Sequence, residues 1–333
     1  MKSLSMFERA LVRAGGTLAS GAGRGGRGLL VLIYHRVLAQ PDPLAQGDVE
    51  ADRFAGQMEL LANCFNPLPL SEALDRLQTR SLPPRAVSVT FDDGYADNLK
   101  VAAPIMRRCG VRGTVFVATG YLDGGLMFND AVIEAMRQAP GRLDLSDLGF
   151  GILELSDMGS RRASSERLIG ELKYREPEER RALAMEILER AGGRRPRGLM
   201  LTRAQVRELR DAGVEIGAHT ETHPILAQIE PTAARDDMAR CKQELEAILG
   251  EPPQLFAYPN GRPGRDYDAR HVAMARDLGF TAAVSTAWGA AYPGCDLFQI
   301  PRVAPWDATA GRYAARLVKS YAQRNYAIAG TGT

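Results

Sequence analysis

Two short segments of the chain carry residue types that bind metal ions. Asp92 and Asp93 are adjacent in AVSVTFDDGYADN, and His219 and His223 are four residues apart in VEIGAHTETHPIL. Imidazoles and carboxylates are common zinc ligands, and a catalytic site typically uses three protein ligands and leaves one position for water. Because neighbouring strand residues point to opposite sides, one carboxylate can bind the ion while the other stays free to accept a proton. A DDG segment alone is equally typical of an exposed turn, so the prediction depends on the two histidines.

The segments before these residues have the apolar character of buried strands. Seven strands are predicted, at Leu29 to His35, Ala86 to Asp93, Gly113 to Thr119, Val214 to His219, Leu255 to Pro259, Thr281 to Thr286 and Phe298 to Val303. Apolar residues at helical spacing predict helices between them, at Asp52 to Ala62, Asp97 to Cys109, Thr202 to Ala212, Thr232 to Leu249 and Asp268 to Leu278. This alternation indicates an α/β fold with a parallel sheet, open or closed into a barrel, in which sites gather at the carboxyl ends of the strands. Those ends carry His35, Asp92, Asp93, His219 and the segment Tyr258 to Asn260.

The chain is predicted to hold one catalytic domain with additions. Residues 29–310 form that domain, residues 1–28 a helical, glycine-rich extension, and residues 311–333 a C-terminal helix and tail. Residues from about 123 to 201 break the alternation, because they are helical and charged and contain no convincing strand. We expect an insertion over one rim of the domain, either a lid or groove wall or a decoration without function.

Composition and charge narrow the class of protein only slightly. The 333 residues are 45% hydrophobic and 25% charged, with a formal net charge of +2, which is ordinary for a soluble enzyme. We expect no nucleic-acid partner. Gly21, Gly23 and Gly26 match the pattern GxGxxG, but they precede the first strand instead of following one, so a connector is favoured over a dinucleotide site. The four cysteines form no CxxC pair, which predicts free thiols.

The N-terminal residues bear on where the protein acts. Residues 1–28 lack the continuous apolar core of a secretory signal, and no run approaches the roughly 18 apolar residues of a membrane span. We therefore expect a cytoplasmic protein. A weak peripheral contact with the inner membrane, through the amphipathic segment Met6 to Val12, is a further option.

The two metal-binding segments together resemble motifs of the polysaccharide deacetylase family, carbohydrate esterase family four, which includes nodulation-factor and chitin deacetylases. TFDDG at Thr90 to Gly94 and HTETH at His219 to His223 match the first two motifs of that family, and the similarity extends from about Leu29 to Asp307. The resemblance implies a distorted (β/α) barrel, here of about seven strands with a helical insertion.

The resemblance also implies roles for the motif residues. Asp92 would be the catalytic base, and Asp93, His219 and His223 would hold a divalent metal ion. Zinc is the default for two imidazoles and one carboxylate, and cobalt, nickel or manganese could substitute.

Two other family motifs are changed in this chain. The third motif usually has an arginine before its proline and tyrosine, whereas FAYPNG has Ala257 at that position. Arg302, at the end of the last predicted strand, is the candidate to orient Asp92 instead, with an ordinary surface ion pair as the alternative. The C-terminal histidine of the last motif is absent. His35 resembles the permuted arrangement of exopolysaccharide-associated and poly-N-acetylglucosamine deacetylases, and we expect it to be the general acid, because the first and last strands of a closed barrel are neighbours.

These residues predict hydrolysis of the N-acetyl group of an aminosugar, in a polysaccharide or in its lipid-linked or nucleotide-linked precursor. A backbone N–H near Asn260 is expected to stabilise the oxyanion. Aromatic rings that could flank sugars, although such rings are more often core, are those of Tyr95, Tyr258, Phe128 and Trp306. The alternatives are removal of a formyl group or an O-acetyl ester, for instance from a lipid-linked sugar, a glycan-binding protein without catalysis, and a structural metal site, which usually has four protein ligands.

Overall fold

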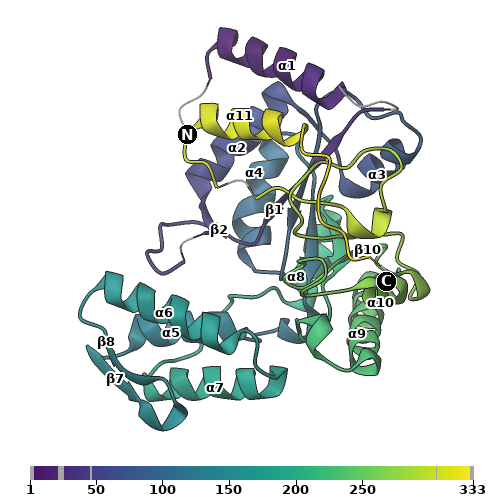
Figure 1. Ribbon diagram of the computed structural model, residues 1–333. Coiled ribbons are helices and arrows are strands. Elements are labelled where there is room, and N and C mark those ends of the chain that lie inside the picture. Colours follow the sequence, from purple (N-terminus) through teal and green to yellow (C-terminus); the bar gives the residue numbers. More distant parts are fainter. Residues whose placement is uncertain (1–3, 22–25, 46, 305, 331–333) are drawn as a thin grey trace.

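A parallel sheet forms the centre of the molecule, shown in Figure 1. The computed structural model describes residues 4–21, 26–45, 47–304 and 306–330. The strand order is β1–β5–β6–β9–β10–β11, and β4 pairs with the start of β5. The strands are β1 (Leu29–Tyr34), β4 (Asn66–Pro67), β5 (Ala86–Phe91), β6 (Gly113–Val117), β9 (Glu215–Ala218), β10 (Leu255–Ala257) and β11 (Ala282–Val284). Six of the seven predicted strands are confirmed, and each ends one or two residues before its predicted end.

The prediction of a seventh regular strand, Phe298 to Val303, is wrong, but the segment does lie at the position where that strand was expected. It begins as a 3-10 turn, η5 (Leu297–Gln299), and Pro301 has no N–H to donate to a ladder. The segment still joins the two edges of the sheet. Ser285 N–H donates to Ile300 O at 2.8 Å, next to β11, and Val303 N–H donates to Val31 O of β1 at 2.8 Å. The sheet therefore closes into a distorted (β/α) barrel.

Helices and short elements surround the barrel strands. The helices are α2 (Ala51–Cys64), α3 (Leu70–Gln78), α4 (Ala103–Arg108), α8 (Arg203–Asp211), α9 (Pro231–Leu249) and α10 (Ala269–Asp277). The helix predicted from Asp97 begins as a π-helical turn, η1 (Asn98–Ala102), and α3 was not predicted. The remaining short elements are β2 (Val37–Leu38), β3 (Val49–Glu50), η2 (Thr119–Tyr121) and η4 (Leu226–Gln228).

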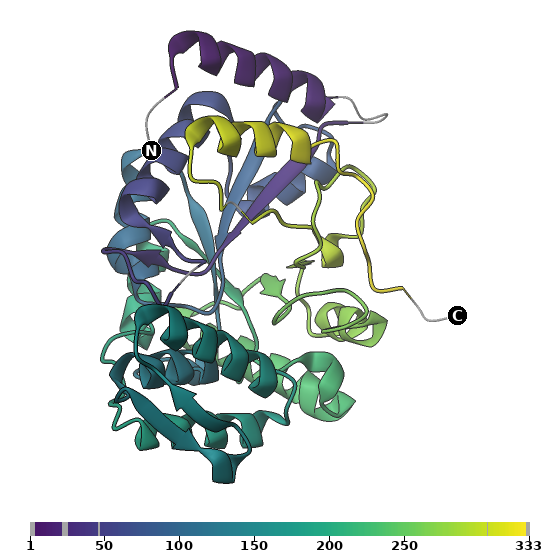
Figure 2. The same ribbon diagram turned by 60° about the vertical axis from the view of Figure 1, so that its left-hand side comes forward.

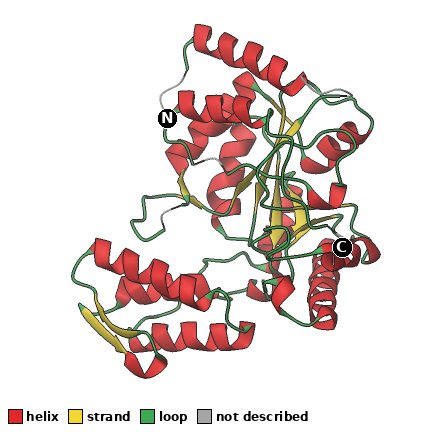
Figure 3. Cartoon of the chain, viewed as in Figure 1, coloured by secondary structure: helices red, strands yellow, loops and turns green. Residues whose placement is uncertain are grey.

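The predicted insertion has a hydrophobic core of its own, beyond the carboxyl ends of the strands (Figure 2). Its helices are α5 (Phe128–Gln138), α6 (Met158–Leu172) and α7 (Pro177–Arg190). The expectation of no strand is wrong, because β7 (Arg142–Leu145) and β8 (Gly151–Glu154) form an antiparallel hairpin around the turn η3 (Ser146–Leu148), drawn in yellow in Figure 3. Four-residue strands are too short to stand out from a helical background by periodicity.

Two helices lie side by side at the opposite end of the molecule from the insertion, as Figures 1 and 2 both show. They are α1 (Met6–Gly21) and α11 (Ala310–Ser320). Gly21 ends α1, and Gly23 lies outside the described residues. None of the helices among the described residues has the length and apolar character needed to cross a membrane.

Candidate metal centre

The ends of β5 and β9 bring the motif residues to one place. Asp92 N–H donates to Tyr34 O at 3.0 Å, which holds the residue just beyond β5. Asp93 then adopts a left-handed φ of 75° and turns out of the strand direction. His219 follows β9, where its N–H donates to Val117 O of β6 at 3.0 Å. Parallel strands that end at the same level thus place both motifs at one edge of the barrel.

Asp93, His219 and His223 present one ligand atom each toward a common point. His219 Nε2 and His223 Nε2 both lie 3.4 Å from Asp93 Oδ1. All three ligand atoms are within 4.8 Å of one another. Ligand atoms that lie about 2.0–2.1 Å from one tetrahedral ion are about 3.4 Å apart. The three side chains therefore fit around a single small cation.

The protonation state of this cluster also suits a cation. His219 Nδ1 lies 2.8 Å from Ala257 O, which can only accept, so Nδ1 carries a proton and Nε2 faces the common point. Against the effect of burial, the carboxylates of Asp92 and Asp93 raise the pKa of His219, and a bound cation would replace a proton on Nε2. Burial lowers the pKa of His223 to about 3, so its imidazole is neutral. Within the described part of the chain, Asp93 Oδ1 is buried and has no hydrogen-bond donor. A buried carboxylate oxygen without a donor is costly unless a cation compensates it.

Backbone strain is concentrated in the same site. Seven non-glycine residues in the described chain have a left-handed φ, and four of them lie here, namely Asp93, Thr220, His223 and Asn260. Such residues cost about 1–3 kcal/mol each and persist where the surrounding structure holds them.

Two residues that the sequence analysis did not single out hold the turn between the histidines. Asp237 of α9 accepts hydrogen bonds from Glu221 N–H at 2.6 Å and from Thr222 N–H at 3.2 Å. Arg180 of α7 is buried and donates from Nη2 to His223 O at 3.3 Å. The insertion therefore contacts the backbone of a candidate ligand. No local motif marks either residue, because both sit in ordinary charged helices.

Asp92 is held by Arg302 in a buried, two-pronged ion pair. Arg302 Nη1 and Nη2 lie 2.7 Å from the two carboxylate oxygens of Asp92, and Arg302 Nε donates to Ser285 O at 2.9 Å. Burial by itself would raise the pKa of Asp92, but Arg302, His219 and His35 together outweigh burial, and the pKa is lowered. Asp92 is therefore ionised, and its Oδ2 lies 4.0 Å from His219 Nε2. The predicted pairing of Arg302 with Asp92 is present, and the alternative of a surface ion pair is wrong because Arg302 is buried.

His35 lies just after β1 at the rim of the site. It is exposed, and its carbonyl accepts a hydrogen bond from Asn98 Nδ2 at 2.9 Å. After burial, Arg302 and His219, the charge of His35 is a further influence on the pKa of Asp92, which it lowers.

The structure places the other predicted substrate-contacting residues, Tyr258, Asn260 and Phe128, in different environments. Tyr258 is fully buried and stacks on Tyr267 with ring centroids 3.9 Å apart, so the expectation that its ring contacts substrate is wrong. Side chains of successive residues point to opposite sides near a strand end, and Tyr258 packs with Phe256 in the main hydrophobic core. Asn260, with a φ of 60°, is half-buried, and its carbonyl accepts from Thr286 Oγ1 at 2.8 Å. Phe128 lies under Arg180, whose guanidinium carbon is 4.5 Å from the ring centroid.

Tyr95 and Trp306 differ from each other in exposure. Tyr95 is buried and its hydroxyl donates to Asp130 Oδ2 at 3.1 Å, so it supports the rim of the site instead of presenting a free ring, and that expectation is corrected. Burial raises the pKa of Asp130 to about 7. Trp306 is 59% exposed and lies 5.4 Å from Trp288 between ring centroids.

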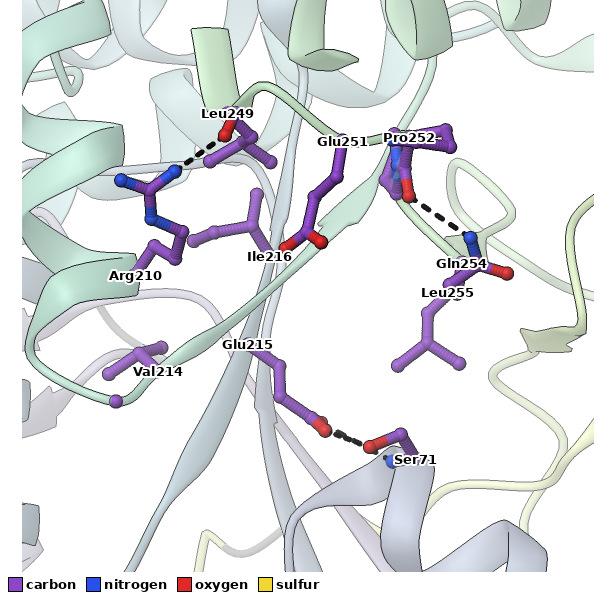
Figure 4. A pocket seen from close by; sticks show the side chains of 12 residues that line it. Ser71, Arg210, Val214, Glu215, Ile216, Leu249, Glu251, Pro252, Gln254 and Leu255 are labelled. Atoms are coloured by element: carbon purple, nitrogen blue, oxygen red, sulfur yellow. Dashed lines mark hydrogen bonds between the residues drawn. The ribbon is translucent and has the colours of Figure 1, made fainter.

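A separate hollow lies at the amino ends of β9 and β10, far from these residues along the strands (Figure 4). It has a volume of about 420 Å³, and Glu215 and Ser71 lie on its wall. The Glu215 carboxylate already accepts from Leu70 N–H at 2.9 Å and from Thr114 Oγ1 at 2.8 Å. Glu215 therefore caps the start of α3, whose first N–H groups need acceptors, and it is not free to bind a ligand.

Two histidines and two carboxylates thus gather at the strand ends of a (β/α) barrel, an arrangement that suits a metal-assisted hydrolase. The polysaccharide deacetylase family model matches residues 79–146 and 168–283, which include both motifs. The chain belongs to the polysaccharide deacetylase family of hydrolases.

Individual relatives are distant in sequence. YxkH of Bacillus subtilis (strain 168), provisionally named as a polysaccharide deacetylase, is 22% identical over 277 residues, covering 83% of this chain and 70% of that protein. The structure of the Streptococcus pyogenes deacetylase PplD in complex with acetate superposes with a TM-score of 0.60 at 19% identity, over 88% of this chain and 99% of that one. IcaB from Ammonifex degensii gives 0.57 at 20% identity, over 89% and 98%. At these identities the structural likeness concerns the fold.

Proposed function

We propose that this protein removes the N-acetyl group from an aminosugar in a polysaccharide or its precursor, with the help of a divalent metal ion. The observation that carries the proposal is the pairing of two carboxylates with different surroundings. Asp93 faces two imidazoles, whereas Asp92 is held by Arg302. A purely structural metal site usually has four protein ligands and does not need an ionised carboxylate beside them. A protein that only binds glycans does not need such a carboxylate either.

Asp93, His219 and His223 are the residues that would hold the ion, and zinc suits this donor set. A bound divalent cation supplies a Lewis acid that polarises the acetyl carbonyl and makes a water molecule more acidic. Cobalt, nickel and manganese accept the same donors, so reconstitution of the metal-free protein with each ion is the experiment that identifies the preferred metal.

The chain's own groups would move the protons. Asp92 accepts a proton from the attacking water, and Arg302 fixes the direction of its carboxylate. His35, exposed at the rim, gives a proton to the departing amine. The backbone N–H of Asn260 is the candidate donor to the oxyanion. The division into residues 1–28, a catalytic part 29–310 with an insertion at 123–201, and residues 311–333 belongs to this proposal.

The proposal is tested by product analysis with two variants. The enzyme reconstituted with zinc is incubated with N-acetylglucosamine oligomers, N-formyl analogues and O-acetylated sugars, and released acetate or formate is measured. We expect acetate from the N-acetyl substrate. Asp92→Asn should abolish release while the protein keeps its zinc, and Asp277→Asn, on the exposed part of α10, is the matched control with normal activity. Release of formate alone would indicate a deformylase, and release of acetate from the O-acetylated sugars alone would indicate an O-deacetylase. Binding of oligomers without release of either acid would indicate a non-catalytic glycan-binding protein.

A further inference from the structure

The outward face of α1 is apolar and has no partner among the described residues. Phe7, Ala10, Leu11, Ala14 and Leu18 follow one another at the spacing of a single helix face. The three large side chains of this stripe are strongly exposed, at 72% for Phe7, 56% for Leu11 and 75% for Leu18. We name these five residues the α1 stripe.

The exposure of the α1 stripe does not come from a detached helix. The opposite face of α1 is docked on the barrel, where Ser20 Oγ accepts from Arg85 N–H at 3.0 Å. A Cβ at Gly16 would lie 3.1 Å from the Arg85 side chain and 3.7 Å from Val318 of α11, so this contact is close. Val12 packs against the main hydrophobic core. The helix thus has two apolar faces, and the fold covers only one of them.

Positive charge surrounds the α1 stripe. Residues 1–28 contain the five basic residues Lys2, Arg9, Arg13, Arg24 and Arg27 and the one acidic residue Glu8. Residues 307–324, which include the neighbouring α11, contain the four basic residues Arg312, Arg316, Lys319 and Arg324 and the one acidic residue Asp307. Among the described residues of these two segments, seven basic residues therefore stand against two acidic ones. Arg13, Arg312, Lys319 and Arg324 are exposed.

We propose that this end of the molecule docks on an anionic lipid bilayer, with the α1 stripe at the boundary between headgroups and acyl chains. An amphipathic helix with large apolar side chains and flanking basic residues binds such surfaces through buried apolar area and electrostatic attraction. A second copy of the chain fits less well. A twofold contact through the stripe would bring the same basic residues of two copies together, and like charges repel.

The docking would fix the direction of the candidate metal centre. Arg85, which contacts α1, precedes the first residue of β5, and Asp92 follows its last. The six residues of β5 span about 20 Å. The site therefore opens away from the bilayer, toward glycan in the aqueous phase. This inference does not depend on the proposed deacetylation.

Vesicle co-sedimentation of the full chain tests the proposal. We expect the protein to sediment with vesicles of mixed phosphatidylglycerol and phosphatidylcholine, and far less with phosphatidylcholine alone. The triple variant Phe7→Ser, Leu11→Ser, Leu18→Ser should lower the partition coefficient at least about tenfold. The matched control replaces three exposed apolar residues elsewhere, Ile152→Ser, Met158→Ser and Ile328→Ser, and should bind as the unmodified protein does. Circular dichroism establishes that both variants are folded.

Charge and self-association are tested separately. Arg312→Gln, Lys319→Gln and Arg324→Gln together should weaken binding to anionic vesicles by about tenfold or more. The proposal is overturned if the unmodified protein stays in the supernatant with anionic vesicles, or if the stripe variant binds as well as its control. It is also overturned if sedimentation equilibrium without lipid finds a dimer that the serine substitutions dissociate.

Discussion

Arg302 donates hydrogen bonds to both carboxylate oxygens of Asp92, each at 2.7 Å. The two residues are buried and lie 210 residues apart in the sequence. The arginine comes from the short segment that closes the sheet between β11 and β1. The third motif has Ala257 where an arginine was expected, and Arg302 supplies a guanidinium to Asp92 from another part of the chain. Closure of the barrel and orientation of the candidate base therefore depend on the same four residues, 300 to 303.

Arg302→Met should destabilise the protein, because it leaves the Asp92 carboxylate buried without its partner. Breaking a buried pair in this way costs about 3–5 kcal/mol. In an Asp92→Asn background the same substitution should cost clearly less, because no charge is left unpaired. Urea unfolding of the four proteins measures the coupling. Equal costs in the two backgrounds would show that Arg302 acts mainly through packing.

Arg302→Lys keeps a positive charge but loses the two parallel hydrogen bonds. We expect turnover to fall about 10- to 100-fold with little change in bound zinc. Metal analysis beside the kinetic assay separates the two effects. A protein that loses its zinc but works normally once zinc is added back would contradict the role of Arg302 in orienting the base.

Asp237→Asn should weaken metal binding, although Asp237 is not a candidate ligand. Its carboxylate accepts hydrogen bonds from the backbone of the turn between the two histidines. Loss of an interaction that supports ligands typically costs 10- to 100-fold in metal affinity. Competition with a zinc-binding dye measures the affinity, and Asp236→Asn on the exposed neighbouring position of α9 is the control. An unchanged zinc affinity in a normally folded variant would show that Asp237 does not support the metal ligands.

Much of this arrangement follows from local sequence. The barrel strands are short, continuous apolar runs, and polar residues that end such runs must gather at one edge of a parallel sheet. Arg302 was a candidate because it ends the last run. The roles of Asp237 and Arg180 could not be predicted, because their contacts with the 219–223 turn arise only when α9 and the insertion pack there. The burial of Tyr258 likewise depends on its stack with Tyr267, which is nine residues away in the sequence.

Asp130 should make the protein less stable as the pH rises. Burial is the main reason that the pKa of this carboxyl is raised from 3.8 to about 7 in the folded protein. The unfolded chain loses its proton near pH 4 and the folded chain only near pH 7, so stability falls between these values and stays low above them. Asp130→Asn removes the loss and keeps an acceptor for Tyr95. Urea unfolding should find the variant more stable than the unmodified protein at pH 8, by at most about 4 kcal/mol, and nearly equal at pH 4. The same difference at both pH values would mean that ionisation of Asp130 is not the cause.

His35→Gln should slow hydrolysis according to the leaving group. An amine must be protonated as it departs, whereas a nitrophenolate leaves without a proton. If His35 is the acid, the variant should lose about 10²- to 10⁴-fold in turnover of the N-acetyl substrate and much less with 4-nitrophenyl acetate. His271→Gln, in α10, is the matched histidine control, since His271 is the N3 residue of that helix and bonds to Asp268 at its cap. Equal losses on both substrates would assign His35 to binding or to the shape of the rim, because neither of those roles depends on how readily the leaving group departs.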